Sequence, residues 1–350
     1  MASRHALSTP SRIVVRLPNW LGDVLMARPL LHALRVAHPQ AELRAVGKAA
    51  LLALLASERA FDAGEAWPAP GELAPDALRA ARRGLTATLR SFRPDVALVL
   101  PFSFSSAWFA RGLGAPMRVG YAHELRSPLL THALRRPARG ERHLSEEYLA
   151  LGGPIGVGAG HAPDPLPLLP VTSEADAGGA ALIGRLLPGV TRFAVMAPRS
   201  AYGPAREWPL ERFAALARRL TARGIAVIVC GTAAERESCR RVAEHSGAGV
   251  VSAAGETDLP TLAALVRRAA LAVCNDSGLA HLSGAVGTAT VTLYGSTSSA
   301  WTAALGPEVR VIQHPPVCSP CFRRTCRIGY PCLTGLGLDE VDGVCREAGA

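Results

Sequence analysis

Short apolar, β-branched runs alternate with longer helical segments along this chain of 350 residues. In the first half, strands are expected at 12–17, 41–47, 94–102 and 117–121. Helices are expected at 24–38, in the Ala/Leu segment after residue 47, and at 104–113. Such alternation is typical of a parallel sheet with helices on both faces. The first half is therefore expected to be a doubly wound α/β domain.

The same alternation restarts after a Gly- and Pro-rich stretch that has no helical period and begins near Leu151. Strands are expected at 192–198, 225–231, 250–255, 271–275 and 289–295, with helices at 210–224, after residue 231, and at 259–269. We therefore expect an N-terminal domain at 1–155, a linker at 156–178 and a C-terminal domain at 179–350. Ligands of such sheets bind beyond the carboxyl ends of the strands, so the two domains should face each other across a cleft. The alternative is a long surface loop inside one domain.

Composition restricts the class of protein. The formal net charge is +10, which favours an anionic partner such as nucleic acid, acidic lipid or a phosphorylated substrate. Aromatic residues make up only 5% of the chain, which argues against a platform for stacking nucleic-acid bases. No apolar run approaches the roughly 18 residues that span a bilayer, and the first residues lack an apolar signal core. We expect a cytoplasmic protein.

Two clusters of small polar residues follow two neighbouring predicted strands, at 275–278 and 295–297. At the first, a helix start with Ser277 and Gly278 would offer unsatisfied N–H groups to an anion. Hydroxyl and N–H donors of the second cluster would complete a cradle for a diphosphate; its residues are Gly295, Ser296 and Thr297. Because a carboxylate repels phosphate, Asp276 is expected to accept hydrogen bonds from sugar hydroxyls instead. The alternative is that Asp276 or Ser277 only caps the helix.

Three further residues follow predicted strands, two in the second half of the chain and one in the first. His281 is on the helical face of Ser277 and could donate to a phosphate oxygen, although a helix histidine is more often a packing residue. Arg206, just before Trp208-Pro209 opens a helix, could clamp a phosphate or be an exposed loop arginine. In the first half, Asp23 follows a strand and could accept a proton from a hydroxyl nucleophile, or cap the helix.

Eight cysteines are present, and four of them crowd near the C-terminal end: Cys318, Cys321, Cys326 and Cys332. The first two have the spacing of a zinc knuckle, but the second two are spaced unlike a zinc ribbon. A disulfide framework is disfavoured in a cytoplasmic chain. The alternatives are therefore a structural zinc and loop cysteines that bind no ligand.

Together, five motifs resemble the heptosyltransferases of lipopolysaccharide inner-core synthesis, glycosyltransferase family 9. The motifs are LGD at 21–23, GPAREWP at 203–209, GTAAERE at 231–237, NDSGLAH at 275–281 and LYGSTS at 293–298. They fall in the family's order and span nearly the whole chain. The GPAREWP segment and the CSPCF tail are most similar to the type II branch of the family.

The resemblance implies a GT-B architecture, two Rossmann-like domains with the site between them. It also implies an ADP-heptose donor, an anionic lipopolysaccharide core acceptor, inversion at the sugar, and no required cofactor or metal. Asp23 matches the family's general base. An acceptor of this kind would be met at the inner membrane surface, and nucleic acid is not expected as a partner.

Donor-binding roles also follow from the resemblance. Arg206 stands where the family usually has a lysine that neutralises the diphosphate, and Lys48 is the only lysine in this chain. Glu235 matches an acid that binds the adenosine ribose, and Asp276 matches the acid that holds heptose hydroxyls. Phosphate-side neighbours are matched by Ser277, Gly278 and His281. The family's Thr/Ser pair ahead of the lysine is matched only in part, by Ser200.

An arginine-rich segment at 126–142 carries five arginines and one glutamate. It could bind carboxylates or phosphates of the acceptor, through Arg126, Arg135, Arg136 and Arg142. The alternative is a solvated basic loop.

For the whole protein, the alternatives are another heptosyltransferase type, a family 9 enzyme with a different nucleotide sugar, and a non-catalytic protein that binds nucleotides or nucleic acid.

Overall fold

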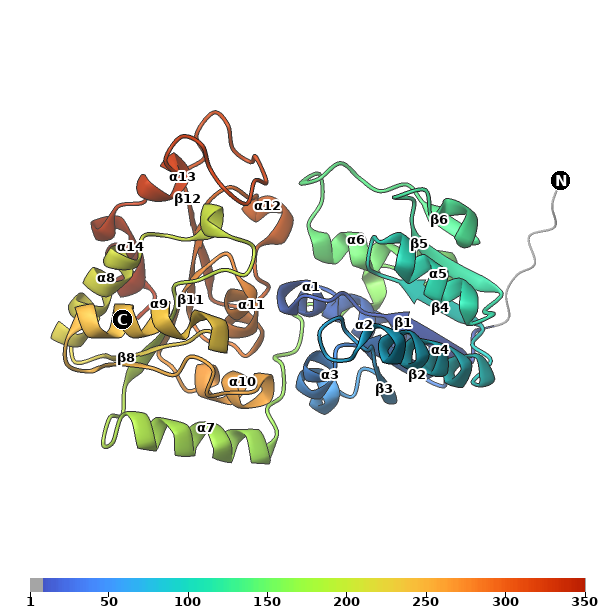
Figure 1. Ribbon diagram of the computed structural model, residues 1–350, viewed down its shortest axis with the longest axis horizontal. Coiled ribbons are helices and arrows are strands. Elements are labelled where there is room, and N and C mark those ends of the chain that lie inside the picture. The colour runs from blue at the N-terminus through green and yellow to red at the C-terminus, as the bar shows by residue number, and fades with distance from the viewer. Residues whose placement is uncertain (1–8, 350) are drawn as a thin grey trace. The chain divides into compact units, whose positions relative to one another are not determined.

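The computed structural model describes residues 9–349, which form two compact units divided between Pro167 and Leu168 (Figure 1). This division lies inside the segment predicted as a linker. The end of that segment is helical, because α7 (Ser173–Leu186) begins within it. Thr172 caps this helix by accepting the N–H of Ala175 at 3.2 Å.

Unit 1 contains a parallel sheet with the strand order β3-β2-β1-β4-β5-β6. Its strands are β1 (Arg12–Arg16), β2 (Glu42–Gly47), β3 (Ala63–Ala66), β4 (Val96–Val99), β5 (Met117–Tyr121) and β6 (His132–Leu134). Its α-helices are α1 (Leu21–Met26), α2 (Arg28–Ala37), α3 (Ala49–Leu55), α4 (Pro75–Ser91), α5 (Phe104–Gly112) and α6 (Leu144–Ala150). Strand β4 is a fully buried apolar run, and β1 is buried at every residue except Arg12, as expected when helices cover both faces of a sheet.

Unit 2 contains a second parallel sheet with the strand order β12-β11-β10-β7-β8-β9. Its strands are β7 (Phe193–Ala197), β8 (Ala226–Val229), β9 (Val250–Ser252), β10 (Leu271–Asn275), β11 (Thr290–Tyr294) and β12 (Val309–Gln313). After α7 its α-helices are α8 (Leu210–Ala222), α9 (Arg236–Ser246), α10 (Leu259–Arg267), α11 (Gly278–Ala285), α12 (Ser299–Thr302), α13 (Pro331–Thr334) and α14 (Leu338–Glu347).

Counted from its own first strand, each sheet has the order 3-2-1-4-5-6 of the Rossmann fold. The predicted α/β class with two doubly wound domains is therefore confirmed. The order reverses between β1 and β4 in unit 1 and between β7 and β10 in unit 2. Ligands of open parallel sheets bind beyond the carboxyl ends of the strands at such reversal points. These two places are where site residues should gather.

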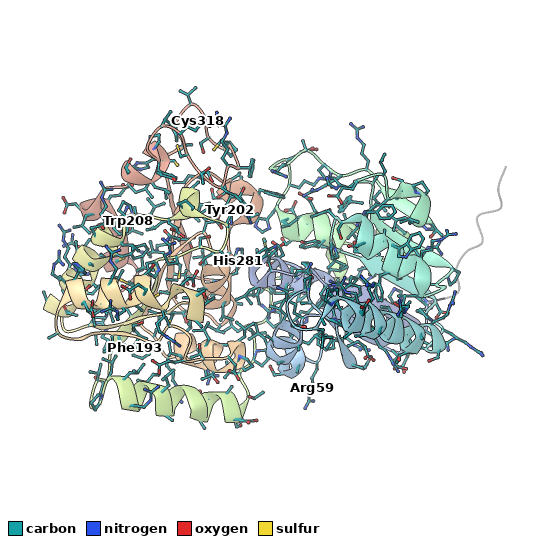
Figure 2. The ribbon with its side chains drawn as sticks, in the orientation of Figure 1. Arg59, Phe193, Tyr202, Trp208, His281 and Cys318 are labelled. Carbon is teal, nitrogen blue, oxygen red and sulfur yellow. The ribbon has the colours of Figure 1, made fainter. Side chains whose placement is uncertain are left out.

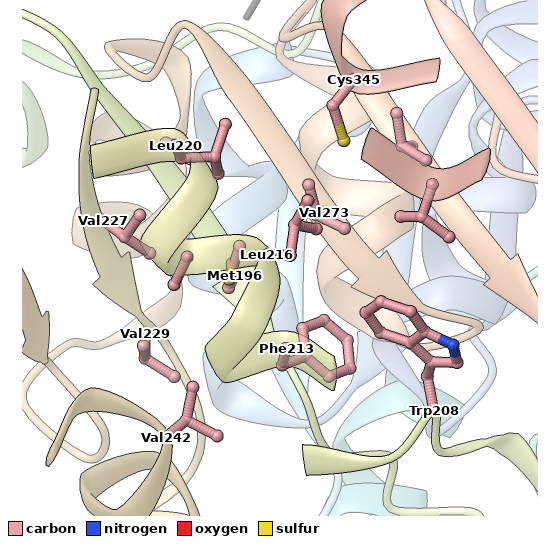
Figure 3. Close-up of a cluster of buried hydrophobic side chains, with 14 of the residues drawn as sticks. Met196, Trp208, Phe213, Leu216, Leu220, Val227, Val229, Val242, Val273 and Cys345 are labelled. Atoms are coloured by element: carbon pink, nitrogen blue, oxygen red, sulfur yellow. The ribbon is translucent and has the colours of Figure 1, made fainter. Parts of the chain in front are cut away.

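The core of unit 2 fixes the chain that follows β7 (Figure 3). Trp208 is fully buried, with its ring 5.2 Å from that of Phe213 in an edge-to-face arrangement. Its indole N–H donates to the carbonyl of Leu336 at 3.0 Å. A buried aromatic side chain with a satisfied polar atom is a strong anchor. Because Trp208 is only two residues after Arg206, this anchor limits where that arginine can lie.

The secondary structure differs from the sequence-based expectation in a few places. The helix expected at 24–38 is two helices, α1 and α2, because Pro29 has no N–H and favours the first turn of a new helix. The strands β3, β6 and β12 were not expected; each lies at an edge of its sheet and carries partly exposed residues. The helices that were also not among those expected are α4, α6, α7, α12, α13 and α14. Within residues 9–349, no helix is both long and apolar enough to cross a membrane.

Candidate active site

The reversal point of unit 2 is held together by Asn275, the last residue of β10. Its side chain is fully buried, accepts the N–H of Trp208 at 2.9 Å and donates to the carbonyl of Pro198 at 2.8 Å. One amide therefore ties the segment after β7 to the end of β10. This bridging role was not predicted, because only the folded chain brings residues 198 and 208 to residue 275.

Asp276 and Arg206 form an ion pair at this point, with 3.1 Å between Nε of Arg206 and Oδ2 of Asp276. Asp276 is 1% exposed and also accepts a hydrogen bond from the hydroxyl of Thr297 at 2.5 Å. Burial raises the pKa of Asp276, while Arg206, Thr297 and Tyr294 oppose that rise by stabilising the carboxylate. The guanidinium of Arg206 also lies 3.9 Å from the ring centre of Tyr202. An aspartate and an arginine are thus held in fixed positions at the predicted ligand site.

The N-terminus of α11 lies next to this pair. Ser277 is the residue before the helix, but its side chain does not cap the helix. Its Oγ is shielded from solvent and has no hydrogen-bond partner in the described part of the chain. A buried hydroxyl without a partner at the positive end of a helix dipole is suited to an anionic ligand. Gly278 begins the helix, and His281 is buried within it, 5% exposed.

The second predicted cluster differs from expectation. The N–H of Ser296 donates to the carbonyl of Ala205 at 3.0 Å, and its hydroxyl donates to the carbonyl of Arg323 at 3.0 Å. The hydroxyl of Thr297 donates to Asp276. The prediction that these donors bind a diphosphate is therefore wrong for the Ser296 N–H and for both hydroxyl protons. They brace the site instead.

Gly295 allows this bracing, because a Cβ there would lie 2.4 Å from the carbonyl oxygen of Ala205. We expect Gly295→Ala to lower the free energy of unfolding by about 3 kcal/mol, since a backbone oxygen cannot move aside as a flexible side chain can. Chemical denaturation measures the effect. Gly184→Ala, in α7 with no neighbour within 4 Å, is the matched control and should be neutral or slightly stabilising. Unchanged stability of Gly295→Ala would contradict the bracing role.

Ser200 and Glu235 also have partners within unit 2. The hydroxyl of Ser200 donates to the carbonyl of Asp276 at 3.2 Å, and its N–H donates to Glu207 at 3.0 Å. Burial raises the pKa of Glu207, against the effects of the Ser200 N–H and of Arg199. Glu235 accepts the N–H of Thr232 at 2.7 Å in a capping box. Ser200 therefore supports the backbone at Asp276, and Glu235 is fixed at the end of β8.

The cysteine-containing segment packs on the same site. The carbonyl of Phe322 accepts the hydroxyl of Tyr202, and the N–H of Phe322 donates to the carbonyl of Ser296 at 2.8 Å. The carbonyl of Arg324 accepts the N–H of Ala205 at 3.1 Å. Cys318, labelled in Figure 2, and the other cysteines of this segment are thiols. In residues 9–349, no group of three or more His, Cys, Asp or Glu side chains is arranged to hold a metal ion. The segment's observed role is to hold the 3₁₀ helix Pro204–Arg206 in place.

At the reversal point of unit 1, Asp23 lies in the first turn of α1, directly after β1. The cap residue of this helix is Trp20, so Asp23 is not the N-cap. Asp23 is partly exposed, and its charge is one cause of the raised pKa of Tyr148, after burial of that tyrosine. The Asp23 carboxylate is therefore a partly exposed acid in the first turn of the helix that follows β1.

The arginine-rich segment separates into buried and exposed members. Arg126 is fully buried and donates to the carbonyl of Tyr121 at 2.8 Å and to that of Ser103 at 3.2 Å. Burial lowers its pKa to about 10. The prediction that Arg126 contacts an acceptor is wrong, because its guanidinium supports the backbone. Arg136 is paired with the buried Glu147 at 3.1 Å and stacks on Phe102. The exposed arginines are Arg135, Arg139 and Arg142.

Two Rossmann-type sheets are the architecture of the GT-B class of glycosyltransferases, and the second sheet here carries an arginine–aspartate pair beside a helix N-terminus. Residues 82–330 match glycosyltransferase family 9 (heptosyltransferase). The chain belongs to this family, and the resemblance inferred from the motifs is confirmed.

The similar proteins are heptosyltransferases. Lipopolysaccharide heptosyltransferase 2 of Salmonella typhimurium is 32% identical over 309 residues, covering 86% of this chain and 88% of that protein. The Escherichia coli protein of the same name is 31% identical over 309 residues, which again cover 86% of this chain and 88% of that protein. The solved structure of E. coli ADP-heptose lipopolysaccharide heptosyltransferase II is 27% identical, with a TM-score of 0.79 over 96% of this chain and 98% of that one. E. coli heptosyltransferase bound to ADP, at 20% identity and a TM-score of 0.72, shares the fold.

Proposed function

We propose that the protein transfers heptose from ADP-heptose to the inner core of lipopolysaccharide, as a type II heptosyltransferase. The observation that carries the proposal is the group at the reversal point of unit 2, formed by Arg206, Asp276 and Ser277 before α11. It combines a cation and a helix N-terminus for a diphosphate with a carboxylate for sugar hydroxyls. The relatives named lipopolysaccharide heptosyltransferase 2 support the acceptor, and the similarity to E. coli ADP-heptose lipopolysaccharide heptosyltransferase II supports the donor.

The donor is bound by unit 2. Arg206 faces the diphosphate, and the N-terminal turn of α11 with Gly278 and the Ser277 hydroxyl completes the anion site. Asp276 accepts hydrogen bonds from the heptose. The carboxylate of Glu235 binds the ribose of the adenosine. His281 contributes to the phosphate side from within α11. Thr297 acts indirectly, because its hydroxyl orients Asp276.

Asp23 is the general base. As the acceptor hydroxyl oxygen forms a bond to the anomeric carbon, the bond from that carbon to the β-phosphate oxygen breaks. The hydroxyl proton passes to Asp23, and the electron pair leaves with ADP. Attack from the face opposite the leaving group inverts the anomeric centre. Arg206 and the start of α11 stabilise the charge that develops on ADP, so the reaction requires no metal ion.

The acceptor is an anionic core lipid, so the enzyme works in the cytoplasm and at the inner membrane surface. The exposed arginines of unit 1, Arg135 and Arg142, contact carboxylates or phosphates of the acceptor, and Arg136 positions the segment by its ion pair with Glu147. No role for nucleic acid is proposed.

The test is a transfer assay with purified protein, ADP-heptose and a core lipid that already carries one heptose. Mass spectrometry should show the addition of one heptose, both with and without a chelator. A core lipid that lacks heptose serves as the control acceptor and should react far more slowly. Preferential transfer to that control would assign the chain to type I, a name borne by a Pseudomonas aeruginosa relative 30% identical over 77% of this chain. Absence of transfer to either acceptor would refute the proposal.

A further inference from the structure

The helices α4 and α5 of unit 1 present a surface that the transfer reaction does not use. Along the 17 residues of α4 only Leu89 is fully buried, so most of this helix faces solvent. On α5, Phe104 is 45% exposed and Trp108 is 62% exposed, and their rings stack with centres 6.3 Å apart. Large aromatic side chains that are this exposed, and paired with each other, mark an interaction surface.

A cavity of about 420 Å³ lies where these helices meet. The helices approach closely there, since a Cβ at Gly112 would lie 2.9 Å from the Thr86 side chain. Its lining combines aromatic and cationic side chains; it includes Trp67, Trp108, Phe109, Arg82, Arg83 and Arg90. Trp67 and Phe109 are in edge-to-face contact at 4.9 Å. The cavity is therefore lined by both apolar rings and positively charged groups.

The charge on α4 and α5 is strongly positive. The helices α4 and α5 together carry five arginines against one aspartate, Asp76, a net charge of +4. Asp76 is already paired with Arg79. Arg83 and Arg90 are exposed and form no ion pair with any described residue. Two unpaired guanidinium groups beside exposed aromatic rings are complementary to an anionic amphiphile.

A neighbouring loop adds an apolar contact. The carboxylate of Glu124 accepts the N–H of Phe104 at 3.1 Å, which brings this loop to the start of α5. The next residue, Leu125, is 92% exposed and has a left-handed backbone, with φ of 55°. A leucine held in a strained conformation and directed to solvent is costly unless it has a partner.

We propose that the α4–α5 face, defined by Arg83, Arg90, Phe104, Trp108 and Leu125, docks on an anionic lipid bilayer. Arginines attract the acidic head groups, and aromatic rings partition into the interfacial region of a bilayer. The apolar rings that line the cavity contact part of a lipid chain. The proposal rests on the proposed function, because it names the surface by which the enzyme reaches a lipid acceptor.

Vesicle sedimentation with the full-length protein tests the proposal without requiring sugar transfer. Wild-type protein should bind vesicles of phosphatidylglycerol and phosphatidylcholine at least tenfold more tightly than vesicles of phosphatidylcholine alone, at about 0.1 M salt. Arg83→Glu/Arg90→Glu should lower binding to the anionic vesicles at least tenfold. Arg218→Glu/Arg241→Glu, which reverses two exposed arginines on α8 and α9, is the matched control and should stay within twofold of wild type. Equal loss in both variants, or no loss in the first, would overturn the proposal.

Fluorescence quenching tests whether Trp108 enters the bilayer. Lipids with brominated acyl chains should quench the tryptophan fluorescence of wild-type protein more than that of Trp108→Phe, while both bind. Equal quenching would show that Trp108 does not enter the bilayer. A concentration-dependent dimer that Trp108→Ala dissolves would assign the face to self-association instead.

The two proposals fail in different ways. With acceptor dispersed in detergent, Arg83→Glu/Arg90→Glu should transfer heptose at the wild-type rate. Vesicle binding without any transfer by the wild type would refute the proposed function and leave the docking surface standing. Transfer in detergent without vesicle binding would refute the docking surface and leave the proposed function standing.

Discussion

Asp23→Ala is expected to lower the rate of heptose transfer about 10²- to 10⁴-fold, which is the usual contribution of a general base. The affinity for ADP should not change, because the proposed nucleotide site lies in unit 2. Single-turnover kinetics and calorimetric titration with ADP measure the two quantities. The fold should survive, since a carboxylate in the first turn of a helix contributes only about 0.3–1 kcal/mol through the helix dipole.

Two variants sharpen this test. Asp23→Asn keeps the shape of the side chain but cannot accept the proton, so it should be about as slow as Asp23→Ala. Asp76→Ala removes another first-turn acid of the same unit, in α4, and should transfer heptose in detergent at the wild-type rate. Transfer by Asp23→Asn at more than a tenth of the wild-type rate would exclude Asp23 as the base.

Arg206→Ala is expected to weaken ADP binding about 10- to 100-fold, which corresponds to one or two hydrogen bonds to a charged group. It should also destabilise the protein by about 3 kcal/mol, because Asp276 is 1% exposed and would lose its cation. Burial raises the pKa of Asp276, and Arg206 opposes that rise. Without Arg206, the pKa of Asp276 should therefore rise further. Calorimetry and chemical denaturation report the two effects separately.

A double variant separates binding from folding. In Arg206→Ala/Asp276→Asn the buried charge is gone, so stability should return toward the wild-type value, whereas ADP binding should stay weak. Arg206→Lys should recover part of the affinity, because a lysine keeps the charge but loses the planar geometry of the guanidinium. Wild-type ADP affinity in Arg206→Ala would refute the clamp role, and recovery of affinity in the double variant would show that the loss came from misfolding.

The fold was largely predictable because parallel sheets leave a strong trace in the sequence. Strands such as β7 and β10 are buried on both faces and therefore appear as continuous apolar runs. The edge strands β3 and β6 leave little trace, since half of such a strand remains in solvent. The break between α1 and α2 was visible at Pro29, but the apolar period that continues through it concealed the boundary.

The candidate site was predictable in position but not in its hydrogen bonds. Asp276, Ser277 and Gly278 lie at the reversal point of unit 2, as expected for residues between a strand and a helix. The capping box of Thr232 and Glu235 was readable from the TxxE spacing and was missed. Tyr202, whose ring supports the guanidinium of Arg206, gave no local signal.

The sequence by itself determined the alternation of strands and helices, the family, and which short segments follow the strands. Tertiary structure alone decided which polar groups at those places remain available to a ligand. Ser296 donates to Arg323, 27 residues away, and Arg126 donates to Ser103, 23 residues away. Ser277 instead keeps a buried hydroxyl that has no hydrogen-bond partner among residues 9–349. The physical reason is that a buried donor must find an acceptor, and residue type and local spacing do not reveal which distant backbone carbonyl will fold against it.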